Sequence, residues 1–67
     1  MKRASYIQAI EWVAFNDEPN QLELNEIEES TTVLLVADLF QKNPTDVAER
    51  VLITRKEMIR EYMRSTK

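Results

Sequence analysis

The side chains with the clearest chemical potential in this sequence are four closely spaced carboxylates, Asp17, Glu18, Glu23 and Glu26. Neighbouring carboxylates can hold a hard cation, but this stretch lacks the spaced oxygen ligands and the turn glycine of an EF-hand loop. We therefore predict no metal site. Two interpretations stay open for the four residues: a solvated loop with a favourable helix start, or a surface that binds a basic groove on a partner protein.

Missing residue types exclude most other chemistry. The chain has neither His nor Cys, which removes the usual zinc ligands, the thiol nucleophile and the imidazole general base. It has no Gly, which removes the loops that bring backbone close to the phosphates of nucleotides. A chain of 67 residues also has little room for a walled cleft around a site made of carboxylates alone. We expect neither enzymatic activity nor a cofactor.

The net charge of −3 hides an uneven distribution along the chain. Residues 11–29 hold seven acidic residues and no basic ones, whereas residues 50–67 hold six basic residues and two acidic ones. Such a layout favours solubility and can orient an approaching partner. The longest apolar run, Val33 to Ala37, is too short to span a membrane, and the N-terminus lacks the apolar region of a secretory signal. We expect a cytoplasmic protein that does not enter membranes.

Helical periodicity predicts one all-α domain, a three-helix bundle over residues 1–67. The first helix is expected over 5–15, the second over 25–41, beginning with a capping box of Asn25 and Glu28, and the third over 44–64. The β-branched residues of 31–36 would also suit a buried strand, but the chain offers no second strand to pair with it. The apolar run from Val33 covers the whole circumference of a helix, so we expect the second helix to be the most buried.

The periodicity also predicts a core. Four residues are expected at its centre: Leu35, Leu39, Val51 and Leu52. Arg55 interrupts the apolar face of the third helix, and we expect its aliphatic stem to follow the core edge while its charge stays in water. The aromatic residues are expected in the core, namely Tyr6, Trp12, Phe15 and Tyr62. If Trp12 is exposed instead, it would be a natural anchor for a partner protein.

A homodimer is expected because the apolar residues exceed what one small bundle can cover. The residues left at its margins are Trp12, Leu22, Leu24, Ile27 and Ile53. Together they could form a symmetric contact between two copies of the chain.

The junction of the second and third helices has the outline of a helix-turn-helix. Asn43 can cap a helix and Pro44 suits its first position, which makes DNA binding the alternative function, with Thr45 and Arg50 as candidate base-reading residues. The turn usually carries a glycine, however, and here Gln41 stands in its place. Carboxylates at positions 46 and 49 would also repel phosphate, so we expect no DNA binding near physiological salt.

Three stretches together resemble short uncharacterised accessory proteins encoded by bacteriophages. They are Trp12 to Pro19, Leu34 to Phe40, and the helix start at Asn43-Pro44. The resemblance implies a small protein made inside a bacterium, where such proteins commonly bind a host protein or regulate genes. It assigns no function to individual residues. We therefore expect a non-enzymatic protein that binds another protein of the host or the phage.

Overall fold

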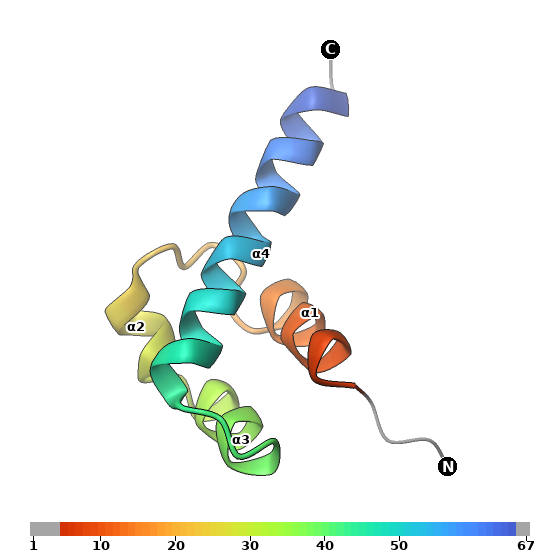
Figure 1. Cartoon of the computed structure of the whole chain (residues 1–67). Helices are drawn as coiled ribbons and strands as arrows, with labels where there is room; N and C mark the ends of the chain where they lie inside the picture. The colour runs from red at the N-terminus through yellow and green to blue at the C-terminus, as the bar shows by residue number, and fades with distance from the viewer. Residues whose placement is uncertain (1–4, 66–67) are drawn as a thin grey trace.

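The computed structural model describes residues 5–65, which fold into four α-helices without a β-strand (Figure 1). In chain order they are α1 (Tyr6–Asn16), α2 (Leu24–Glu28), α3 (Thr31–Leu39) and α4 (Pro44–Ser65). The all-α prediction is thus confirmed. Among these described residues, no helix is long and apolar enough to cross a membrane.

The expected second helix is wrong, because the chain divides it into α2 and α3. Ser30 has an extended backbone (φ −63°, ψ 132°) and forms the N-cap of α3, so the helix cannot continue through it. Its hydroxyl donates a 2.5 Å hydrogen bond to the carboxylate of Asp17. The predicted capping box is also wrong, since both Asn25 and Glu28 lie inside α2, and Glu23 holds the N-cap position without a side-chain hydrogen bond to the helix.

Local signals define α1 at both ends. Ser5 and Gln8 form a reciprocal capping box at its start, in which the Ser5 hydroxyl accepts from the Gln8 N–H and the Gln8 side chain accepts from the Ser5 N–H. The helix ends at Asn16, and Glu18 follows in the left-handed region with φ 46°, immediately before Pro19. Both boundaries agree with the predicted range to within a residue.

The corner between α3 and α4 is closed by hydrogen bonds on both sides. The Lys42 N–H donates to the Ala37 carbonyl at 2.8 Å, and Gln41 adopts φ 54°, which together form a Schellman ending for α3. On the other side, the Asn43 side chain accepts from the Thr45 N–H at 2.8 Å, so the predicted helix cap is present. A glutamine thus holds the left-handed conformation that a glycine would adopt more easily.

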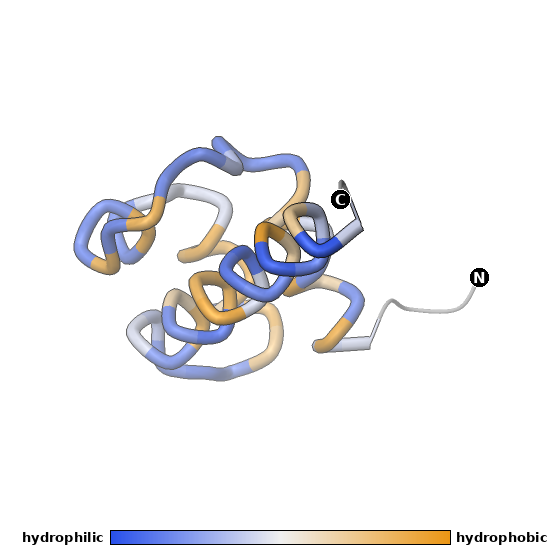
Figure 2. The backbone as a smooth tube through the Cα atoms, turned by 90° about the horizontal axis from the view of Figure 1, so that it is seen from above, coloured by the Kyte–Doolittle hydropathy of each residue, from blue (hydrophilic) through white to orange (hydrophobic). Residues whose placement is uncertain are grey.

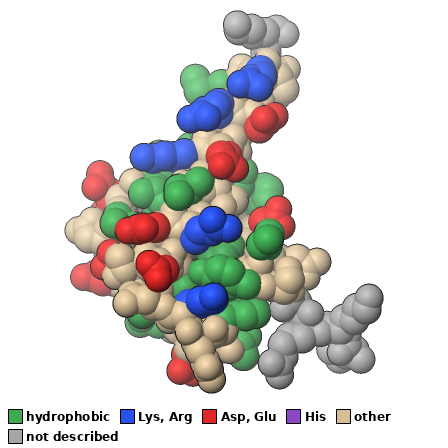
Figure 3. Space-filling view, in the orientation of Figure 1, with side chains coloured by type: hydrophobic (Ala, Val, Ile, Leu, Met, Phe, Trp, Pro, Cys, Tyr) green, Lys and Arg blue, Asp and Glu red, His purple; other side chains and the backbone are tan. Residues whose placement is uncertain are grey.

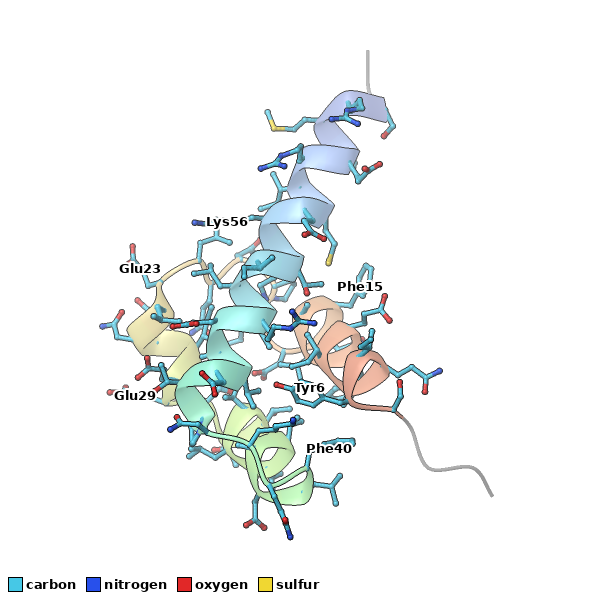
Figure 4. All side chains as sticks on the ribbon, viewed as in Figure 1. Tyr6, Phe15, Glu23, Glu29, Phe40 and Lys56 are labelled. Atoms are coloured by element: carbon cyan, nitrogen blue, oxygen red, sulfur yellow. The ribbon has the colours of Figure 1, made fainter. Side chains whose placement is uncertain are left out.

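An aromatic contact connects this corner to the beginning of α1. The rings of Tyr6 and Phe40 lie 5.5 Å apart, and the Lys42 ammonium lies 5.2 Å from the Tyr6 ring centre. Figure 4 shows both aromatic side chains at this end of the molecule. Burial raises the pKa of the Tyr6 hydroxyl above its ordinary value, as expected for a half-buried ring.

The core is built from small side chains around α4, which packs against each of the other three helices. Its buried apolar members are Ile10, Val13, Ala14, Ile27, Val33, Ala37, Val47, Ala48 and Val51. Val51 was predicted correctly and Leu52 is half-buried, but Leu35 and Leu39 are 64% and 60% exposed. Ile27, which we expected at the margin, is fully buried.

α4 rather than α3 is the most buried helix over its first half. α3 buries only Val33 and Ala37, four residues apart on one face, and its other side chains are half-buried or exposed. Along α4, hydrophobic and hydrophilic positions alternate with the helical period, as the view from above shows (Figure 2). The expectation of a fully surrounded middle helix is therefore wrong.

The C-terminal part of α4 extends beyond the other helices (Figure 1). We call residues 56–65 the arm; every residue of the arm is exposed except Met58, which is half-buried. Tyr62, expected in the core, is 70% exposed here. The arm thus continues α4 as a largely exposed helical segment.

Candidate protein-binding groove

Arg55 is the largest fully buried side chain of the described structure, with only 1% of its surface exposed. Its guanidinium donates hydrogen bonds to main-chain carbonyls only. Nε bonds Ala14 at 3.2 Å, Nη1 bonds Gln21 at 3.1 Å, and Nη2 bonds Val13 at 3.2 Å and also Asp17. The expectation that this charge remains in water is wrong.

These bonds place a cation at the C-terminal end of α1. The last carbonyls of a helix lack intrahelical partners and carry a partial negative charge, and α1 has no basic residue of its own in its last turn. Arg55 supplies both the donors and the charge from α4. Burial lowers the pKa of Arg55 from its ordinary value, while the charges of Asp17 and Glu18 act in the opposite direction. The contact fixes the end of α1 and the loop that follows it.

The fixed end of α1 presents two aromatic side chains to solvent. Trp12 and Phe15 are each 58% exposed, so the expectation that both belong to the core is wrong. They lie three residues apart and border a groove of about 620 Å³ between α1 and α3. The groove is lined largely by apolar groups, contributed by Gln8, Ala9, Glu11, Trp12, Phe15, Asn16, Thr32, Leu35 and Val36.

Helical spacing brings these residues to one surface. Trp12 and Phe15 are neighbours on α1, and Leu35 follows Thr32 by three residues on α3. In Figure 4, Phe15 lies on the α1 side of α4, whereas Glu23 and Glu29 lie on the opposite side, near α2. We call the apolar surface around Trp12, Phe15 and Leu35 the groove.

Three of the four predicted acidic residues surround one depression. Glu18, Glu23 and Glu26 line a hollow of about 550 Å³ in the loop before α2. Asp17 is placed differently, since its carboxylate is half-buried and accepts a hydrogen bond from Ser30. Figure 3 shows acidic side chains gathered on the left of the molecule, where α2 lies.

The acidic surface borders the apolar groove. Asp17, Glu18, Glu26 and Glu29 line a second hollow that also includes Thr32, and Thr32 belongs to the wall of the groove. Glu11 adds a carboxylate to the groove itself. The arrangement combines an apolar trough with negative charge beside it. Among residues 5–65, no group of three or more carboxylates could hold a metal ion.

The two candidate DNA-reading residues do not share a face of α4. Thr45 and Arg50 are both exposed, but a separation of five residues places them about 140° apart around the helix. Arg50 lines a depression between α1 and α4, beside Ile7 and Glu57. The structure therefore does not bring the pair together for one contact.

The groove was only partly visible in the sequence. The alternative of an exposed Trp12 as an anchor indicated one of its walls, but no local pattern indicated that Leu35 would lie opposite. No protein-family model matches this chain, and comparisons with curated proteins and with solved structures find no significant match. The groove and the carboxylates beside it are thus the features that point to a function.

Proposed function

We propose that this chain is a small non-enzymatic protein that binds another protein through the groove between α1 and α3. The single observation that carries the proposal is the exposure of Trp12 and Phe15 beside Leu35, around an apolar groove of about 620 Å³. Aromatic residues are enriched among those that dominate binding energy, and small monomeric proteins rarely expose several large apolar side chains together. The sequence resemblance suggests the bacterial cytoplasm as the setting and an accessory role during phage infection.

The geometry and charge of the groove favour a particular partner. A trough between two helices suits a third, amphipathic helix, whose apolar residues at i, i+3, i+4 and i+7 would face Trp12, Phe15 and Leu35. The adjoining carboxylates of Glu18, Glu26 and Glu29 favour basic residues along one flank of that helix. We therefore propose a partner segment that is apolar on one face and basic beside it.

Replacing Trp12 by alanine should weaken binding of that partner by about 2 kcal/mol or more, or roughly 30-fold, since large aromatic anchors carry most of the energy of an interface. The matched control is Ile7→Ala, which truncates a side chain on the same helix that is similarly exposed (61%) but lies outside the groove. Each variant would be used as bait for affinity capture from nuclease-treated bacterial lysate. Captured proteins would be identified and quantified by mass spectrometry.

The proposal requires a protein that the unmodified chain and Ile7→Ala retain and Trp12→Ala loses. Equal capture by all three baits would rule out the groove as the binding site. Capture that disappears on nuclease treatment would instead favour DNA binding, the second candidate function.

One structural observation favours that second candidate. Gln41 adopts the left-handed conformation (φ 54°) that the turn of a helix-turn-helix requires, so the missing glycine does not prevent such a turn. Against it, Asp46 and Glu49 are exposed on the first two turns of α4, where they would face phosphate. DNA binding through Thr45 and Arg50 therefore ranks below protein binding.

A further inference from the structure

The arm carries an apolar face that the single chain covers only in part. Val47, Val51 and Arg55 face the core, and the same side of α4 continues into Met58 and Tyr62 with alternating spacings of three and four residues. This is the spacing by which a helix buries one side against another helix. Tyr62 is nevertheless 70% exposed, and Ile59 beside it is 41% exposed.

This apolar face borders a concave surface at the point where the arm leaves residues 5–55, which we call the body of the molecule. We call this concave surface the corner. This corner, of about 390 Å³, is lined mainly by Phe15, Pro19, Leu22, Met58, Ile59 and Tyr62. It shares only Phe15 with the groove between α1 and α3. A partner in the corner would therefore leave Trp12 and Leu35 accessible.

The charge of the molecule changes sign between the body and the arm. The arm has three basic residues and two acidic ones: Lys56, Arg60, Arg64, Glu57 and Glu61. Residues 5–55 have ten acidic residues and only three basic ones, Lys42, Arg50 and Arg55, the last of them buried. Figure 3 shows side chains of both signs along the arm and on the body, with the acidic ones of the body gathered mainly on its left. One copy of the chain thus offers a basic helix, and another copy offers an acidic surface.

We propose that the corner is occupied by the arm of a second copy of this chain. The two copies would be related by a two-fold axis, so that each arm crosses the other molecule and places Ile59 and Tyr62 in the opposite corner. A two-fold contact uses the same patch on both copies, and this patch contains both the inserting residues and the cavity that receives them. The basic arm then lies over acidic loop residues such as Glu18, which makes the contact favourable in charge as well as in apolar burial.

The dimer also accounts for the length of α4. A helix end without tertiary contacts is marginal in water, because helix stability in proteins comes mainly from packing of an apolar face. Pairing the two arms supplies that packing. The proposed homodimer thus uses a different surface from the one expected from the sequence. Of the residues expected at the contact only Leu22 lines the corner, and four lie outside it: Trp12, Leu24, Ile27 and Ile53.

The test is the molar mass of the full chain, measured by sedimentation equilibrium over a range of concentrations up to tens of micromolar. We expect the unmodified protein to form a dimer, and Ile59→Glu to raise its dissociation constant by at least about 100-fold, because a carboxylate would be buried without a partner. The matched control is Ile53→Glu, on the same helix and 52% exposed, but outside the corner. Ile53→Glu should remain dimeric.

Three results would overturn the proposal: an unmodified chain that stays monomeric throughout, a dimer that Ile59→Glu leaves intact, or a dimer that both variants weaken equally. Circular dichroism of each variant shows whether it is folded, and the mass of the unmodified chain decides the first point irrespective of any variant. Trp12→Ala should stay dimeric, so that failure of the dimer and failure of the groove as a binding site are distinguishable.

Discussion

Replacing Arg55 by methionine should lower the free energy of unfolding by about 3 kcal/mol or more. Loss of the guanidinium leaves the buried Ala14 carbonyl without its donor, which costs about 1–3 kcal/mol, and it removes three further charge-assisted hydrogen bonds, to the carbonyls of Val13, Asp17 and Gln21. The Val13 carbonyl still accepts the N–H of Asp17. Methionine preserves the volume but offers no donor. A domain of 67 residues has a total stability of about 3–10 kcal/mol, so the variant would be largely unfolded or close to it.

Urea denaturation followed by circular dichroism measures this loss. The matched control is Arg50→Met, the same substitution at an exposed position of α4 outside the corner, which should change stability by no more than about 0.5 kcal/mol. Arg55→Lys should fall between them, since it keeps the charge but cannot direct donors at all four carbonyls. Equal urea midpoints for Arg55→Met and the unmodified protein would mean that the guanidinium does not hold the end of α1.

Truncation of Ile27 to alanine should cost about 2–5 kcal/mol, because its side chain is 1% exposed and its removal leaves a cavity among close-packed neighbours. Leu35→Ala removes a similar volume from a side chain that is 64% exposed, and should cost less than about 1 kcal/mol. The two variants thus distinguish an α3 that is covered on one face from one that is buried all round. The opposite order of stability, measured by thermal or urea unfolding, would contradict the arrangement of α2 and α3.

The features predicted correctly are those that depend on neighbours in sequence. The limits of α1 and the cap at Asn43 follow from capping chemistry and helical period, which act within one or two turns. The division at Ser30 also had a local signal, since serine before two threonines is a common helix start. The five consecutive apolar residues after it outweighed that signal and made one long helix the simpler interpretation.

The features missed are those that depend on where another element ends. Periodicity places Arg55 on the apolar face of α4, but only the tertiary structure shows that the last carbonyls of α1 lie opposite. Similarly, Leu35 belongs to a fully apolar run, and its exposure follows from the groove that separates α3 from α1 on that side. The groove depends both on the position of α1, which Arg55 fixes, and on the exposure of Leu35 on α3. The sequence could therefore indicate Trp12 as an anchor but not the surface around it.

The fluorescence of Trp12 tests the central claim most directly, because it is the sole tryptophan of the chain and stands in the groove. With 58% of its surface exposed, it should emit at the long wavelengths of hydrated indole and be readily quenched by acrylamide in the native protein. Unfolding should change the spectrum little, whereas binding of the captured partner should shift emission to shorter wavelength and protect it from quenching. A native protein with short-wavelength, quencher-resistant emission that moves to longer wavelength only on unfolding would show that Trp12 is buried and that the groove is closed.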